Sequence, residues 1–471
     1  MSVDLSTLAA VLPSITAPFL ERHGVLPLAL NDGTLRVATW LDAPSAQALD
    51  DLALLCGARV VLERADEAAL RGAIQRLYGT EATAQGMIDS LGGGAPAGPA
   101  PTRALDDLVA QANEAPVVRL VNLLLLEALQ ARASDVHLET YAGALRVRYR
   151  VDGVLQEAPS PPPRLAAAVV SRLKIMADLD IAERRVPQDG RIRLRLQDRS
   201  VDVRVSTVPA LHGESVVLRL LDAARGRIAL DALGMAGDTL ARFRAAITRT
   251  HGIILATGPT GSGKTTTLYA TVETLRTGRE KILAVEDPVE YELAGVPQIP
   301  VHEKAGVTFA SALRAMLRQD PDIMLVGEIR DGETAAIATQ AALTGHLVLS
   351  TLHTNDAAGA LTRLRELGVE PYLVASTVEA VLAQRLVRIW CRECRGAGCD
   401  ACRHTGYRGR QGIHELLVMS DALREAVQAG ADTATLRRLA EAEGMRALRS
   451  EGERLVAAGI TSREEVLRVV T

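Results

Sequence analysis

Short apolar runs bounded by turn residues alternate with segments of helical periodicity along this chain of 471 residues. Near its start, the apolar runs 25–30 and 35–40 flank an Asn-Asp-Gly turn, a pattern typical of a β-hairpin. Apolar residues at helical spacing follow in 45–56 and 67–78. We therefore predict a small α/β module at residues 1–90, which serves either as a docking module or as a plain scaffold.

A stretch rich in glycine and proline, residues 91–104, has the composition of a flexible linker. Beyond it, 116–129 has the pattern of a largely buried helix. Strand patterns then occupy the segments 145–151, 191–196 and 201–205. These elements predict an α+β domain at residues 105–222.

Arginines recur along these strands and just after them. They are Arg146, Arg148, Arg150, Arg191, Arg193, Arg195, Arg204 and Arg219. Because side chains alternate along a strand, those of one strand share one face of the sheet. The pattern indicates either a solvated polar face or, for a few members, positive charge for a phosphate at a domain or subunit boundary.

The segment 258–265 follows an apolar strand pattern and precedes a helical pattern, which is the setting of a phosphate-binding loop. Its residues are Gly258, Pro259, Thr260, Gly261, Ser262, Gly263, Lys264 and Thr265, followed by Thr266. The glycines let backbone N–H groups surround phosphate oxygens, and the following helix adds positive potential. We expect Lys264 to reach the β- and γ-phosphates and the Thr265 hydroxyl to ligate Mg²⁺. The chain therefore binds a nucleoside triphosphate.

Two further apolar strands end in carboxylates, where doubly wound sheets place their ligands. The strand at 281–285 is followed by Glu286, Asp287 and Glu290, of which one could orient the attacking water and another could support Mg²⁺. The strand at 323–326 is followed by Gly327 and Glu328, a Walker B pattern with glutamate where many such enzymes have aspartate.

A third strand pattern, residues 344–354, ends in polar groups near the expected γ-phosphate position. His353 at that end could sense phosphate or neutralise charge. His346, at the start of the segment, is either a second such group or a structural histidine.

Four of the five cysteines lie close together, and their spacing is C-x₂-C-x₄-C-x₂-C. They are Cys391, Cys394, Cys399 and Cys402. Four thiolates at this spacing can close a tetrahedral, structural Zn²⁺ site, with an iron–sulfur cluster as the alternative. The fifth, Cys56, lies in an apolar helical pattern and is expected in a core.

Composition narrows the classes of partner. The net charge is −4 and aromatic residues make up 3% of the chain, so nothing global points to nucleic acid. No apolar run approaches the ~18–20 residues of a membrane-spanning helix, and the start of the chain lacks a signal-peptide pattern. We expect a cytoplasmic protein whose membrane contact is at most peripheral.

Taken together, these segments resemble the secretion ATPase superfamily of type II secretion and type IV pilus assembly. The resemblance rests on the phosphate loop, on 286–290 as the Asp box, on Gly327-Glu328 as an atypical Walker B motif and on 344–353 as the His box. It implies that Glu290 is the catalytic carboxylate and that Glu286, Glu328, Lys264 and His353 also take part in catalysis. The run 383–388, the tetracysteine element and the segment 406–417 also match.

The resemblance implies an α/β fold: a P-loop, RecA-like ATPase core at 228–388 with a PAS-like α+β domain and a small α/β domain before it. It also implies a tetracysteine zinc subdomain at 389–412 and a helical region at 413–471. The second domain swings over the nucleotide in this family, and Arg204 and Arg219 stand where its arginines are expected. Leu138-Glu139-Thr140 departs from the usual proline-containing motif, and the spacer between the cysteine pairs is short.

The function implied is that of a cytoplasmic hexameric ATPase that uses ATP and Mg²⁺, carries Zn²⁺ and powers pseudopilus assembly in type II secretion. Its expected partners are platform proteins of the inner membrane, bound by the N-terminal domain. A pilus-assembly ATPase is the nearest alternative, but the single short N-terminal module and the run 114–122 favour secretion. A DNA-translocating motor and a nucleotide-gated adaptor without turnover are further alternatives.

Overall fold

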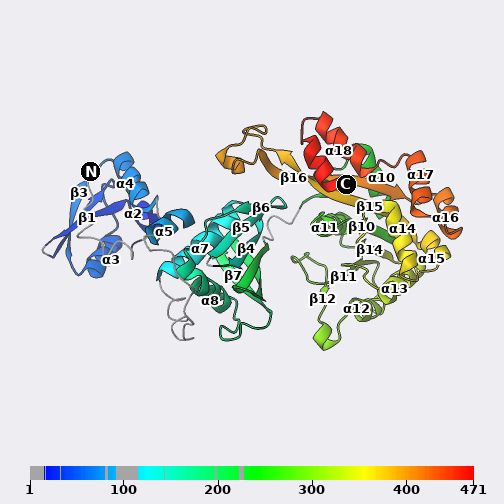
Figure 1. The fold of residues 1–471 in the computed structure, drawn as a ribbon, viewed down its shortest axis with the longest axis horizontal. Helices are drawn as coiled ribbons and strands as arrows, with labels where there is room; N and C mark the ends of the chain where they lie inside the picture. Colours follow the sequence, from blue (N-terminus) through cyan, green and yellow to red (C-terminus); the bar gives the residue numbers. More distant parts are fainter. Residues whose placement is uncertain are drawn as a thin grey trace. The chain divides into compact units, whose positions relative to one another are not determined.

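The computed structural model describes Ile15 and residues 17–31, 33–79, 83–91, 115–142, 144–196, 199–221 and 228–470. The predicted linker after Leu91 lies outside the described residues. The chain divides into two compact units, Met1–Leu194 with Asp202–Leu220 and Leu221–Thr471 with Arg195–Val201. Figure 1 labels the helices and strands of both units.

The first unit begins with a three-stranded sheet in the order β1-β2-β3. Its strands are β1 (Val25–Asn31), β2 (Thr34–Thr39) and β3 (Arg59–Arg64), and its helices are α2 (Ala17–His23), α3 (Ala46–Cys56), α4 (Glu67–Gly79) and α5 (Ala84–Leu91). The predicted hairpin is confirmed, since β1 and β2 pair antiparallel. Leu20, Leu35 and Leu70 are fully buried in the core of this module, and Cys56 packs against that core.

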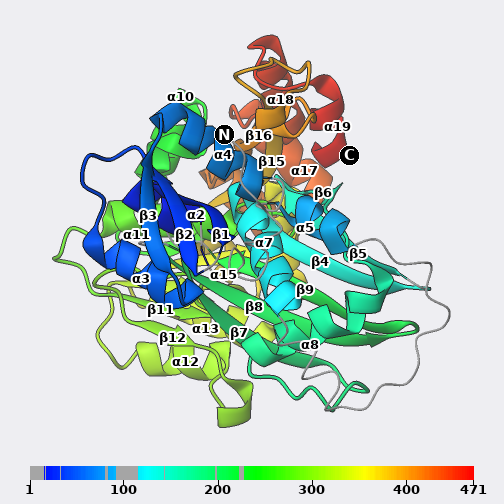
Figure 2. The ribbon, with the colours of Figure 1, turned by 90° about the vertical axis from the view of Figure 1, so that its left-hand side faces the viewer.

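The rest of the first unit is a six-stranded sheet in the order β6-β5-β4-β9-β8-β7. Its elements are α7 (Ala115–Gln130), β4 (Ala133–Tyr141), β5 (Ala144–Val151), β6 (Val154–Glu157), α8 (Ala166–Met176), β7 (Gln188–Leu196), β8 (Arg199–Ala210) and β9 (Gly213–Leu221). Alternate residues such as Val147 and Tyr149 are buried, and the Tyr149 hydroxyl donates to the Leu124 carbonyl of α7 at 2.9 Å. The helices α7 and α8 cover this face (Figure 2).

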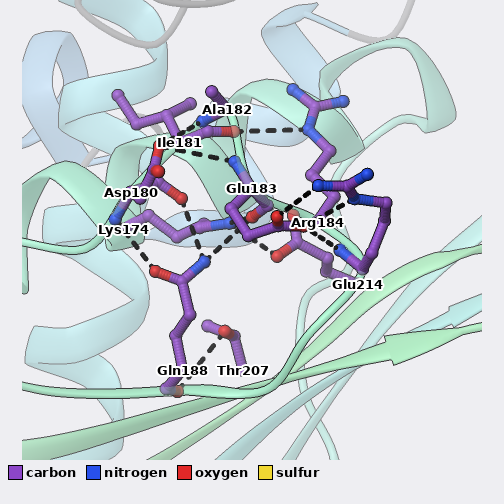
Figure 3. Close-up of polar contacts among 10 residues, drawn as sticks. Lys174, Asp180, Ile181, Ala182, Glu183, Arg184, Gln188, Thr207 and Glu214 are labelled. Carbon is purple, nitrogen blue, oxygen red and sulfur yellow. Dashed lines mark hydrogen bonds and ion pairs between the residues drawn. The ribbon is translucent and has the colours of Figure 1, made fainter.

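A buried ion pair lies between α8 and this sheet (Figure 3). Lys174 Nζ is 2.6 Å from Glu214 Oε1, and the two side chains are 1% and 8% exposed. The ammonium also donates to the Glu183 carbonyl, which accepts a second bond from Gln188 Nε2 at 2.9 Å. These bonds join the loop before β7 to α8 and β9, because each partner satisfies a buried polar group of another element.

The second unit contains a seven-stranded sheet in the order β12-β11-β13-β14-β10-β15-β16. Its strands are β10 (Gly252–Thr257), β11 (Ile282–Glu286), β12 (Gln298–Pro300), β13 (Ile323–Val326), β14 (Leu347–Leu352), β15 (Val378–Trp390) and β16 (Tyr407–Val418). All neighbouring pairs are parallel except β15 and β16, which are antiparallel. The α/β class predicted from the sequence is thereby confirmed.

Helices cover both faces of this sheet. They are α10 (Gly237–Ile247), α11 (Lys264–Leu275), α12 (Phe309–Met316), α13 (Gly332–Leu343), α14 (Ala357–Glu366) and α15 (Pro371–Thr377). Along β10, Ile253 and Leu255 belong to the core on the side of α12 to α15, whereas Ile254 and Ala256 belong to the core on the side of α10 and α11. This alternation explains why the sequence of β10 is apolar throughout: the strand is buried on both faces.

The predicted helical C-terminal region is present as four helices that contribute to the core on the side of α12 to α15. They are α16 (Asp421–Gln428), α17 (Thr433–Ala442), α18 (Leu448–Ala457) and α19 (Arg463–Val470). In the described part of the chain, no helix combines the length and the apolar character that crossing a membrane requires.

The buried pair of α8 and β9 leads to a stability prediction. Lys174→Met leaves Glu214 without its buried partner and should lower the free energy of unfolding by about 3–5 kcal/mol. The double variant Lys174→Met/Glu214→Leu removes both charges and should recover most of this loss. Urea denaturation of the three proteins measures the difference, and equal stability of the single and double variants would contradict the prediction.

Candidate active site and metal centre

The phosphate loop lies at the carboxyl end of β10, and α11 begins at Lys264 with Gly263 as its N-cap. Gly258 and Gly263 have φ values of 147° and 95°, which favour glycine. A Cβ at Gly258 would lie 2.6 Å from the Gln384 carbonyl oxygen, so a side chain does not fit there. Lys264 Nζ donates to the carbonyls of Gly258 at 2.8 Å and Pro259 at 3.1 Å, which places the ammonium inside the loop.

The exposure of the loop fits phosphate binding. Thr260, Gly261 and Thr265 are exposed, with Thr265 in the first turn of α11. Ser262 Oγ is buried and has no hydrogen-bond partner among the described residues. Exposed backbone at a helix N-terminus together with an unsatisfied hydroxyl is suited to the oxygens of a phosphate group.

Glu328 and His353 meet because they follow neighbouring strands, β13 and β14, in which Val326 is aligned with Ser350. His353 Nε2 lies 3.0 Å from Glu328 Oε2, and Arg330 forms an ion pair with the other carboxylate oxygen. Although burial opposes ionisation, hydrogen bonds from Arg330 and His353 hold the pKa of Glu328 below its usual value. Burial lowers the pKa of Lys264, and the charge of Glu328 opposes that effect.

The carboxylates at the end of β11 and just beyond it differ in environment. Glu286 is 4% exposed, accepts a hydrogen bond from the Tyr269 hydroxyl and accepts another from Gln298 Nε2 at 2.8 Å. Burial raises the pKa of this carboxyl, and the two hydrogen bonds oppose the rise. Glu290 is half-buried in the irregular segment that follows. Glu286 is thus directed towards α11 and β12, and Gln298 connects it to the segment that carries Glu290 by donating to the Tyr291 carbonyl at 3.2 Å.

His346 has a local environment. Its Nδ1 lies 2.9 Å from the Ala341 carbonyl and 3.1 Å from Thr344 Oγ1, both at the end of α13. The ring therefore satisfies polar groups at a helix terminus, which fits the structural alternative for this residue.

The two arginines expected to approach the nucleotide, Arg204 and Arg219, lie on β8 and β9 of the other compact unit. Arg219 Nε donates to the buried Asp135 at 3.1 Å, and Arg150 lies 3.8 Å from the same carboxylate. Arg204 is half-buried. Their role at the nucleotide stays a prediction.

Three side chains around these carboxylates were not expected from the sequence. Arg330 holds Glu328, while Tyr269 and Gln298 hold Glu286. Arg330 also lies 3.6 Å from Asp287 and so connects the segments after β11 and β13. Only the position of Arg330, two residues after Glu328, carries a signal in the sequence; the other two contacts depend on the tertiary fold.

The four cysteines lie in the segment that joins β15 to β16, and their Sγ atoms are all within 4.8 Å of one another. Three of the separations are 3.7–3.9 Å. Tetrahedral Zn²⁺ with Zn–S bonds of about 2.3 Å requires S···S distances of about 3.8 Å, so the geometry fits a closed four-thiolate zinc site.

The surroundings of these sulfurs also suit a metal. Backbone N–H groups of Gly398, Cys399 and Gly406 donate to sulfur at 3.2–3.3 Å, which favours thiolates. Trp390 stacks on Tyr407 beside the site, with ring centroids 4.4 Å apart. With four cysteine ligands no position remains open for substrate, so the metal's role here is structural.

This geometry leads to a prediction for the metal. Cys394→Ser should lose about one Zn²⁺ per chain and lower the melting temperature, because a closed four-ligand site contributes to folding. Metal analysis by mass spectrometry and thermal unfolding check it. Iron, or no metal, in the unmodified protein would contradict the zinc assignment.

Comparison with known proteins agrees with this geometry. The family model described as Type II/IV secretion system protein matches residues 110–468, and the MshEN domain matches residues 3–84. Type II secretion system protein E of Pseudomonas aeruginosa is 45% identical over 98% of this chain and 99% of its own length. Type II secretion system ATPase E of Vibrio cholerae is 50% identical over 77% of each chain.

Among solved structures, the pilus retraction motor PilT with bound ADP is 25% identical and has a TM-score of 0.53 over 73% of this chain and 95% of that chain. The family match covers the phosphate loop, the carboxylates after β11 and β13, and the tetracysteine segment. On this evidence the chain belongs to the type II/IV secretion system protein family.

Proposed function

We propose that this protein is a hexameric ATPase on the cytoplasmic side of the inner membrane that powers pseudopilus assembly in type II secretion. The observation that carries the proposal is the cluster of Glu328, Arg330 and His353 at the sheet edge that holds the phosphate loop. The relatives named as type II secretion proteins support secretion, at 45% and 50% identity. They do not favour the pilus-assembly alternative.

Different residues of the chain are proposed to bind the phosphates and the magnesium ion. Lys264 exchanges the carbonyls of Gly258 and Pro259 for the β- and γ-phosphate oxygens of ATP. Thr265 and Glu328 would hold Mg²⁺, which neutralises charge on the phosphates. His353 and Arg330 keep Glu328 ionised and oriented for that purpose.

Glu290 is proposed to orient the water that attacks the γ-phosphate in line. Glu286 supports this role indirectly. It bonds to Tyr269 and Gln298, and Gln298 also holds the Tyr291 carbonyl next to Glu290. Arg204 and Arg219 add positive charge when the second domain closes on the nucleotide. Hydrolysis lets the domain open again, and this rigid-body motion performs mechanical work.

The remaining segments are proposed to work as separate domains within this cycle. Residues 1–90 dock on a membrane platform protein, which the match to the MshEN domain supports. Residues 105–222 form the moving second domain, and residues 228–388 form the ATPase core. Residues 389–412 hold zinc, and the helices of 413–471 complete the core.

Three glutamate-to-glutamine variants test the catalytic assignments. Glu328→Gln and Glu290→Gln should keep nucleotide affinity within a few-fold and lower turnover by about a hundredfold or more, because each removes a group acting in the transition state. Glu286→Gln should lower the melting temperature and reduce turnover less, since its carboxyl lies in a buried network.

Phosphate release under saturating Mg·ATP measures turnover, and equilibrium binding of a fluorescent ATP analogue measures affinity. Near-normal turnover of Glu328→Gln or Glu290→Gln would remove that residue from the mechanism. Turnover by Glu286→Gln lower than that of both other variants would reverse the proposed order of roles.

A complementation experiment tests the biological function. Expression of this chain should restore secretion in a cell of its own source from which the chromosomal copy has been deleted, whereas Lys264→Ala should not, because phosphate binding is lost. Enzyme activity of the secreted cargo in the medium is the readout. Loss of pili with unchanged secretion in the deletion strain would favour the pilus-assembly alternative.

A further inference from the structure

The strand β15 runs past the end of β10 and continues beneath the phosphate loop. Thr257, the last residue of β10, is aligned with Ala383, so the next two residues of β15, Gln384 and Arg385, lie at the level of the loop itself. Both are buried, with 2% and 8% of their surfaces exposed. Polar side chains buried this deeply stay in a core only when their hydrogen bonds are satisfied.

Gln384 connects the loop to the helix that follows it. Its Nε2 donates to the Ser262 carbonyl at 2.8 Å, and its Oε1 accepts from the Thr267 hydroxyl at 2.9 Å. The loop also packs directly on this residue: a Cβ at Gly263 would lie 3.0 Å from Gln384 Nε2. One amide therefore sets the position of the loop relative to the first turn of α11.

Arg385 connects Gln384, and with it the phosphate loop, to the segment that carries His353. Its Nη1 donates to the Gln384 carbonyl at 3.0 Å, and its Nη2 donates to the Asn355 carbonyl at 3.0 Å. Nη2 also donates to Asn355 Oδ1 at 3.3 Å, and the carboxylates of Glu415 and Asp356 act on the guanidinium through their charge. The charge of Arg385 acts on the phosphate loop, since a Cβ at Gly258 would lie 3.1 Å from its Nη1. Burial lowers the pKa of Lys264, and the positive charge of Arg385 adds to that effect.

We propose that Gln384 and Arg385 are positioning residues for nucleotide binding: together they hold the phosphate loop in its binding geometry and connect it to the His353 segment. The proposal rests on the proposed nucleotide binding by this loop. It assigns a purpose to the run 383–388, for which the catalytic scheme above has no role. Glu328 contacts His353, and Asn355, two residues further along the chain, accepts from Arg385. Arg385 in turn donates to the Gln384 carbonyl, and Gln384 donates to the Ser262 carbonyl.

Gln384→Met keeps the size of the side chain and removes both of its hydrogen bonds. It should raise the dissociation constant for fluorescent mant-ADP with Mg²⁺ about tenfold, because the loop is no longer held in one geometry. The matched control is Glu379→Gln on the same strand: Glu379 is 8% exposed and pairs with Arg424 at 2.9 Å, away from the loop. It should lower the melting temperature while leaving the dissociation constant within twofold.

Two further variants separate positioning from general stability. Thr267→Val removes one bond to Gln384, and its effect should not add to that of Gln384→Met, since both act on the same contact. Arg385→Met should weaken binding, and Arg385→Lys should recover part of the loss because it keeps the charge. Saturating Mg·ADP should raise the melting temperature of Arg385→Lys less than that of the unmodified protein, and it should raise that of Arg385→Met least.

The outcomes distinguish this inference from the function on which it rests. Affinity of Gln384→Met equal to that of the unmodified protein would overturn the inference. An equal loss of affinity in Glu379→Gln would also overturn it, because the effect would then come from stability alone. Failure of the unmodified protein to bind mant-ADP would contradict the proposed function itself.

Discussion

Parallel pairing of the central strands is the constraint on which the rest of the second unit depends. Because β10, β11, β13 and β14 run in the same direction, their carboxyl ends meet at one edge of the sheet. The phosphate loop, Glu328 and His353 follow these ends, and Glu286 is the last residue of β11, so the four come from separate stretches of sequence to the same edge. The buried bonds of Ser350 and Thr351 to the carbonyls of Val326 and Gly327 keep β13 and β14 in register there.

The sequence was most informative where chemistry and local geometry coincide. Glycines at 258, 261 and 263 have positive φ values in the structure, and four cysteines at a metal-binding spacing bring their sulfurs together. Strands that are apolar throughout likewise predict an α/β core, because such strands are buried on both faces. Such features depend on neighbouring residues, so a linear pattern is enough to find them.

The environment of each carboxylate could not be read in the same way. Glu286 and Glu290 are alike in the sequence, yet only Glu286 is held by Tyr269 and Gln298 in a buried network. Gln384 and Arg385 interrupt an otherwise largely apolar strand, and the significance of Gln384 depends on a loop far away in the chain. The alternation of arginines in the first unit indicates a shared face, but it does not reveal that Arg219 pairs with Asp135.

The bond between Gln384 and Ser262 joins residues that are 122 positions apart. A ribosome therefore completes the phosphate loop well before it makes the strand that supports it. Long-range strand pairing also forms late in folding, because closing a long loop costs entropy before its contacts can compensate. The nascent chain can consequently form this bond only once β15 has emerged, and a chain truncated before that strand carries the complete glycine-rich motif without the bond.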